Sequence, residues 1–159
     1  MISTIRLYNL SKCLFDRKLY YLSNKVDTFN KLINKCVIHG ETKISSGFNL
    51  GYGGIGVVIH KNAIIGSNCT VSQNVTIGRK RGTNEGVPLL GDNVYVGANS
   101  VVFGNIKIGH NCIIGPCTLV NKSIPPNTIV AGNPFKVIKK ITKENYKDYL
   151  CYNIAYEKL

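Results

Sequence analysis

The chain has 159 residues, of which 44% are hydrophobic, and it carries a formal net charge of +12. This length fits one domain with a small attachment, and the charge favours polyanionic partners such as an acidic membrane surface or a phosphate-rich cofactor. No apolar run is long enough for a membrane span or a signal peptide, so a cytoplasmic location is expected. The basic residues are not interleaved with aromatic ones in a nucleic-acid-binding pattern, so no nucleic acid partner is expected.

Residues 1–36 are expected to form a helical cap. Apolar residues recur there at approximately helical spacing, namely Ile5, Leu10, Leu14, Leu22, Val26, Phe29 and Ile33. One or two short helices would cover the exposed strand edges where the next region begins. An alternative that stays open is peripheral contact with the inner face of an anionic membrane, through Lys12, Arg17, Lys18 and Lys25.

Residues 37–140 repeat with a period of six. Aliphatic residues recur at positions 38, 44, 50, 59, 65, 71, 77, 90, 96, 102, 108, 114 and 120, often followed by glycine. A period of six fits neither an α-helix nor a plain alternating strand, so it predicts a triangular coil of three short strands per turn. The aliphatic residue points to the axis, and a small residue four positions later, such as Cys69 or Cys112, also points inward. The glycines are expected to provide the backbone geometry of the corners.

Two insertions break this period, and breaks in a solenoid collect on functional faces. The interval from Leu50 to Ile59 is three residues too long, and the interval from Ile77 to Leu90 is seven residues too long. The six cysteines include no CxxC pair, so no zinc or redox site is indicated and no metal is expected. Residues 141–159 are expected to form a helical tail outside the prism.

The repeat resembles the hexapeptide-repeat acyltransferases, in particular their serine acetyltransferase and polysaccharide O-acetyltransferase branch. The matching stretches are VSQNVTIG (71–78), LGDNVYVGANSVVFGNIKIGHNCIIG (90–115) and IPPNTIVAGNPFKVI (124–138). The resemblance implies an all-β core folded as a left-handed parallel β-helix, a homotrimer with sites between protomers, and acetyl-CoA as co-substrate.

Counting hexapeptides modulo three predicts which residues share a corner. One column should contain Tyr52, Gln73, Ala98 and Pro116. In the resembling enzymes the pantetheine arm of acetyl-CoA runs along such a column, where Gln73 and Asn74 could bind its amides. Gly78, Gly97 and Ala98 are further candidate contacts, and Arg79, Lys80, Arg81, Lys136, Lys139 and Lys140 are candidate phosphate partners.

The resembling enzymes hold a histidine base two residues after the aliphatic that opens this segment, yet here those positions read Gly51 and Tyr52. Their second histidine falls at Val87 and Pro88, and their carboxylate falls at about Val37. Tyrosine is a poor base but can donate to an oxyanion. His39 and His60 should stack on one corner, which in a trimer can face the neighbour's Tyr52 column, so His60 is the candidate replacement base.

The sequence therefore predicts an acetyl-CoA-dependent O-acetyltransferase, with His60 and Tyr52 as candidate catalytic residues. The expected acceptor is a hydroxyl of a cell-surface polysaccharide or of its sugar precursor. Two alternatives stay open: a catalytically inactive trimer that binds CoA or a partner, and a serine O-acetyltransferase.

Overall fold

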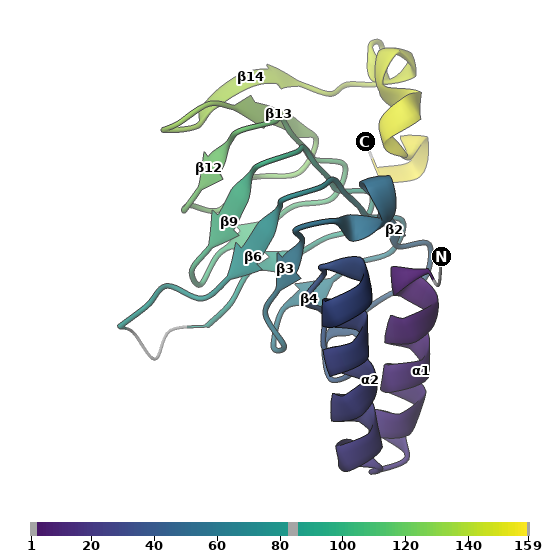
Figure 1. The fold of residues 1–159 in the computed structure, drawn as a ribbon. Helices are drawn as coiled ribbons and strands as arrows, with labels where there is room; N and C mark the ends of the chain where they lie inside the picture. The colour runs from purple at the N-terminus through teal and green to yellow at the C-terminus, as the bar shows by residue number, and fades with distance from the viewer. Residues whose placement is uncertain (1–2, 83–85, 159) are drawn as a thin grey trace.

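The computed structural model describes residues 3–82 and 86–158. Its centre is the predicted left-handed parallel β-helix, whose three sheets form the sides of a triangular prism (Figure 1). The β1 sheet holds β1 (Lys43–Ile44), β4 (Ile64–Ile65), β7 (Leu89–Leu90) and β10 (Lys107–Ile108). The β2 sheet holds β2 (Asn49–Leu50), β5 (Thr70–Val71), β8 (Tyr95–Val96), β11 (Ile113–Ile114), β13 (Thr128–Ala131) and β14 (Lys136–Lys140). The β3 sheet holds β3 (Val58–Ile59), β6 (Thr76–Gly78), β9 (Val101–Phe103) and β12 (Leu119–Val120).

The aliphatic residues of the repeat fill the prism. Ile65 pairs with Leu90 across adjacent coils, and both side chains are at most 1% exposed. Burying each such side chain contributes about 1.5–3 kcal/mol. Cys69 and Cys112 occupy buried inward positions, as predicted, and burial raises the pKa of each thiol to about 11. The period of six thus determines both the strands and the core.

The corners obtain their backbone geometry mostly from asparagine, with glycine at Gly47 and Gly56, and the prediction that the glycine after the aliphatic residue provides it is wrong. Positive φ values of 52–60° occur at Asn68, Asn74, Asn93, Asn99 and Asn111. Gly97, in contrast, has no positive φ. A Cβ on Gly97 would lie 2.6 Å from the backbone nitrogen of Pro116 in the next coil. Glycine is therefore required at position 97 because successive coils approach closely there.

The N-terminal cap consists of α1 (Thr4–Asp16) and α2 (Tyr20–Asn34), which form a hairpin against the first coil (Figure 1). Tyr8 of α1 is 4% exposed, and its hydroxyl donates to the carbonyl oxygen of Thr42 at 2.8 Å. Loss of hydration raises the pKa of Tyr8 to about 12. This confirms the predicted helices at the open end of the solenoid.

The apolar residues that predict α2 do not form its buried face. Leu22, Phe29 and Ile33 are 48%, 43% and 50% exposed, whereas the residues that α2 buries are Ser23, Asn30 and Asn34. Within the described residues, no helix combines the length and apolar character needed to cross a membrane. Contact of this cap with a membrane surface stays a prediction.

The C-terminal segment leaves the prism after β14, which pairs antiparallel with β13. The tail is helical and lies outside the prism as predicted, but its helices are 3₁₀ turns, η2 (Tyr146–Tyr152) and η3 (Tyr156–Lys158). Ile141 and Ile154 pack against Ile113 on the outside of the β2 sheet. The ammonium of Lys158 also pairs with the carboxylate of Asp92, so the tail is held by both apolar and ionic contacts.

Candidate functional site

Gln73, Ala98 and Pro116 form a column where the β2 sheet turns into the β3 sheet, which we call the glutamine corner. The carbonyl oxygen of Gln73 accepts the N–H of Asn99 at 3.1 Å, and that of Ala98 accepts the N–H of Cys117 at 2.8 Å. These bonds place successive corner residues directly above one another, about 4.8 Å apart. The predicted column is therefore confirmed over these coils.

Tyr52 does not belong to this column, and the prediction that placed it there is wrong. The carbonyl oxygen of Ile55 accepts the N–H of Asn74 at 2.9 Å, so Ile55 takes the corner position next to Gln73. Tyr52 lies in the 3₁₀ turn η1 (Gly51–Gly54) with φ 52° and is 80% exposed. Residues 52–54 are therefore the three-residue insertion, which the repeat alone places only somewhere between Leu50 and Ile59.

The candidate phosphate-binding residues separate into two groups. Lys136 pairs with Ala131, which lies against Gly115, so Lys136 is near the glutamine corner. Lys139 pairs with Ile129 further along the same strand, and its ammonium lies 5.9 Å from the Tyr149 ring centroid. Like Lys136, it is exposed.

Gly78, Arg79 and Lys80 lie at the other end of the β3 sheet, where it turns toward the β1 sheet. Arg79 and Lys80 are exposed. A single chain therefore does not bring these residues to the column of Gln73.

His39 and His60 stack at the end of the β3 sheet, which we call the histidine corner. Val37 pairs in parallel with Val58, and the N–H of Ile59 donates to the carbonyl oxygen of Val37 at 2.8 Å. This register places His39 beside His60 in the adjacent coil, as predicted. The loop after Ile77 leaves from the same corner, because the N–H of His60 donates to the Ile77 carbonyl oxygen at 2.8 Å.

The surroundings of His60 favour its neutral form. Partial burial lowers the pKa of His60 below its ordinary value, and the charges of Arg79, Lys61 and His39 lower it further. The Nδ1 atom of His60 accepts the backbone N–H of Asn62 at 3.1 Å. This hydrogen bond occupies the lone pair that a base at Nδ1 would use.

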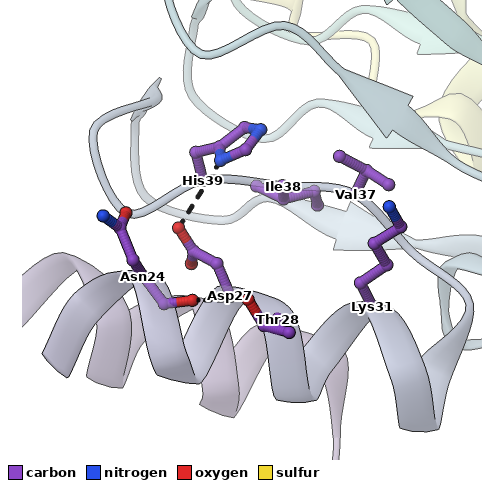
Figure 2. A pocket seen from close by; sticks show the side chains of 7 residues that line it. All are labelled: Asn24, Asp27, Thr28, Lys31, Val37, Ile38 and His39. Carbon is purple, nitrogen blue, oxygen red and sulfur yellow. Dashed lines mark hydrogen bonds and ion pairs between the residues drawn. The ribbon is translucent and has the colours of Figure 1, made fainter. Parts of the chain in front are cut away.

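His39 faces a buried carboxylate that the sequence analysis missed. Its Nδ1 lies 3.5 Å from Oδ2 of Asp27, whose side chain is 11% exposed (Figure 2). Asp27 also accepts hydrogen bonds from the Ser11 hydroxyl and from the Gly40 N–H. The helical spacing of Ser23, Asp27, Asn30 and Asn34 was the available signal for a polar buried face on α2.

The imidazole of His39 borders a cavity of about 410 Å³ between α2 and the first coil. Its lining comprises Asn24, Asp27, Thr28, Lys31, Val37, Ile38 and His39 (Figure 2). Apolar residues occupy the other positions where the resembling enzymes carry charged groups, namely Val37, Val87 and Pro88. Across residues 3–82 and 86–158, no three histidine, cysteine or acidic side chains are grouped for metal binding.

Comparison with known proteins accounts for this architecture. The family model "Bacterial transferase hexapeptide (six repeats)" matches residues 88–122. The serine acetyltransferase of Buchnera aphidicola subsp. Schizaphis graminum is 34% identical over 144 residues, which cover 89% of this chain and 54% of that enzyme. The chain belongs to the hexapeptide-repeat transferase family. The serine acetyltransferase of Staphylococcus aureus is likewise 34% identical, over 130 residues that cover 80% of this hexapeptide-repeat protein and 60% of the relative.

Solved structures resemble this hexapeptide-repeat protein over a similar extent. The Brucella abortus serine acetyltransferase in complex with coenzyme A superposes with a TM-score of 0.80 at 26% identity, covering 87% of this chain and 55% of that one. The Neisseria gonorrhoeae serine acetyltransferase in complex with serine gives a TM-score of 0.79 at 26% identity, covering 86% and 55%. This hexapeptide-repeat protein thus spans little more than half the length of these relatives.

Proposed function

We propose that this protein transfers the acetyl group of acetyl-CoA to a hydroxyl group of its acceptor. The observation that carries the proposal is the column of Gln73, Ala98 and Pro116 at the glutamine corner, which stays in register from coil to coil. The relative of known structure with a TM-score of 0.80 was solved with coenzyme A, which supports the same ligand here.

The pantetheine arm of acetyl-CoA is proposed to run along the glutamine corner. Ala98 is small and half-buried, so it leaves room for the arm, and the amides of Gln73 and Asn74 can pair with those of the pantetheine. The phosphates require cations, and the nearest candidate is Lys136 at the same corner. Gly78 is a further candidate contact for acetyl-CoA, because a glycine lets the ligand approach the backbone closely. Arg79, Lys80 and Lys139 are further candidates to bind the phosphates.

A homotrimer is proposed because the two corners of one chain do not meet. The β3 sheet separates the glutamine corner from the histidine corner, so one protomer cannot enclose acetyl-CoA between Gln73 and His60. A three-fold assembly would place the glutamine corner of one protomer against the histidine corner of its neighbour. Sedimentation equilibrium tests this, and a monomer that retains full activity would contradict it.

Serine is the acceptor that the relatives support, because both curated relatives and the serine-bound structure are serine acetyltransferases. A sugar hydroxyl of a polysaccharide or its precursor is the second candidate. It is favoured by Gly51 and Tyr52, which replace the aspartate and histidine that the resembling enzymes use, since that aspartate helps to hold the amine of serine.

The deciding experiment follows release of the CoA thiol with a thiol reagent while acceptors are varied. The panel contains serine, free sugars and nucleotide sugars, with a matched series of acceptors whose hydroxyl is replaced by hydrogen. Turnover with a hydroxyl acceptor and none with its deoxy counterpart supports O-acetylation. CoA binding by calorimetry without turnover for any acceptor would instead support the inactive, CoA-binding trimer.

A further inference from the structure

His39 and His60 are stacked, yet their ring nitrogens face opposite kinds of partner. A carboxylate only accepts hydrogen bonds, and within the described residues no backbone N–H donates to the Nδ1 atom of His39, so the Asp27 carboxylate 3.5 Å away favours a ring proton on that nitrogen. A backbone N–H only donates, so the Nδ1 atom of His60, which accepts from Asn62 at 3.1 Å, is unprotonated. The partners therefore assign opposite neutral tautomers to the two histidines.

The tautomer determines what each ring can do at its outer nitrogen. In His39 the Nε2 atom keeps a free lone pair and is directed away from Asp27 (Figure 2). In His60 the Nε2 atom carries the proton and can only donate. Burial and the charges of Arg79 and Lys61 lower the pKa of His60, which favours its neutral form.

We propose that His39 is the general base of the acetyl transfer and that His60 stabilises the oxyanion as a hydrogen-bond donor, an inference that rests on the proposed function. It differs from the prediction from the sequence that His60 is the base. The carboxylate partner of His39, Asp27, lies in the cap and outside the repeat, so the repeat pattern does not relate the two residues.

The roles give a balanced reaction. His39 Nε2 takes the proton of the acceptor hydroxyl while the hydroxyl oxygen forms a bond to the thioester carbon of acetyl-CoA. His60 Nε2–H donates to the thioester oxygen as negative charge develops on it. When the carbon–sulfur bond breaks, His39 returns the proton to the departing sulfur, which leaves an acetyl ester and the free CoA thiol.

Asp27 is a positioning residue in this scheme. Hydrogen bonds from Ser11 and Gly40 fix the carboxylate of Asp27. The carboxylate lies 3.5 Å from the Nδ1 atom of His39 and would stabilise the imidazolium formed during transfer. His39 and Asp27 both border the cavity of about 410 Å³ between α2 and the first coil.

Nuclear magnetic resonance of ¹⁵N-labelled histidines tests the tautomers without any activity. The expected result is an Nδ1–H tautomer for His39 and an Nε2–H tautomer for His60 near pH 8. Asp27→Asn should reduce the Nδ1–H population of His39 and leave His60 unchanged, a readout that a purely structural role for Asp27 would not produce. An Nε2–H tautomer at His39 in the wild-type protein would overturn the proposal.

Glutamine substitutions separate the two roles, because glutamine can donate a hydrogen bond but cannot act as a base. His39→Gln should lower kcat by about 10²–10⁴-fold with KM little changed. His60→Ala should lower kcat by about 10²–10³-fold, whereas His60→Gln should recover a large part of that loss. Asp27→Asn should also lower kcat more than it raises KM.

The matched control is His110→Gln. The Nδ1 atom of His110 accepts the N–H of Asp92 at 2.9 Å and lies 3.3 Å from the carboxylate of the same residue, so His110 combines both kinds of partner at another corner. Its substitution should leave kcat unchanged, and circular dichroism verifies that every variant is folded. A rate that survives His39→Gln overturns this inference alone, whereas a wild-type protein without turnover overturns the proposed function and these catalytic roles with it.

Discussion

The backbone N–H of Asn74 donates to the carbonyl oxygen of Ile55 at 2.9 Å. This bond shows that the coil resumes its register at Ile55 and that residues 52–54 are looped out. Tyr52, which the sequence placed at the position of the family's base, therefore stands outside the stack. The loop is a local addition to a continuous prism.

Tyr52→Gly should stabilise the protein. Tyr52 has φ 52° and is 80% exposed, so glycine would relieve a left-handed backbone strain of about 1 kcal/mol and lose little packing. Urea unfolding measures the difference in free energy, with Tyr52→Phe as the control that should leave stability unchanged. The phenylalanine variant also tests the predicted catalytic role of Tyr52, because a large loss of kcat would require its hydroxyl.

Gly97→Ala should destabilise the solenoid by about 1–3 kcal/mol, because the new Cβ would lie 2.6 Å from the Pro116 nitrogen in the next coil. Gly78→Ala is the matched control, since its Cβ would meet only the Thr76 Cγ2 atom, at 3.7 Å. Thermal unfolding of both variants provides the measurement. Equal melting temperatures would contradict the argument that glycine is needed for coil approach.

Arg79→Gln should raise the pKa of His60 toward its ordinary value of 6.5, because it removes a positive charge that lowers it. A pH titration of the His60 ring resonances measures the shift. Arg81→Gln, in the same loop, is the control and should move the pKa less. If Arg79→Gln leaves the titration unchanged, the loop does not lie against the histidine corner in solution.

The His60→Gln variant should lose less free energy of unfolding than the wild-type protein does as the pH becomes acidic. The pKa of His60 is lower in the folded protein than its ordinary value of 6.5, so its contribution to stability is present above pH 6.5. The contribution disappears as the pH falls through the folded value, because the unfolded chain binds the proton more readily. Urea unfolding of both proteins between about pH 7 and about pH 5 should give a shallower slope for the variant. Parallel slopes would show that the proton affinity of His60 does not change on folding.

Asn30→Ala should destabilise the helical cap by about 1–3 kcal/mol. Asn30 is 1% exposed, its side chain donates to the Thr4 carbonyl oxygen at 3.3 Å, and it accepts from the Asn34 side chain at 2.9 Å. Its neighbour Phe29 is 43% exposed. Phe29→Ala should therefore reduce the stability of the cap less than Asn30→Ala does, although it removes a larger side chain. Hydrogen exchange in α2 measures both effects. The reverse order would indicate that the apolar face of α2 is covered in the assembled protein.

The sequence by itself determined the solenoid, its core and most of the stacked columns. Because three hexapeptides make one coil, a residue and its neighbour in the next coil are three repeats apart, not counting any insertion. Gln73 and Ala98 could therefore be paired by counting repeats. Counting failed at Tyr52 because an insertion of three residues can be placed anywhere between two repeats. Only the hydrogen bond from Asn74 to Ile55 locates it.

Tertiary structure alone decided how the cap meets the coil. The apolar spacing of α2 predicts a helix but points to the wrong buried face, because polar contacts with α1 and the first coil determine how α2 packs. No periodic rule relates Asp27 to His39, whose approach depends on the docking of α2. The proposed protonation of the two histidines follows from such contacts. A carboxylate favours a proton on Nδ1 of His39, whereas a backbone N–H requires an unprotonated Nδ1 in His60.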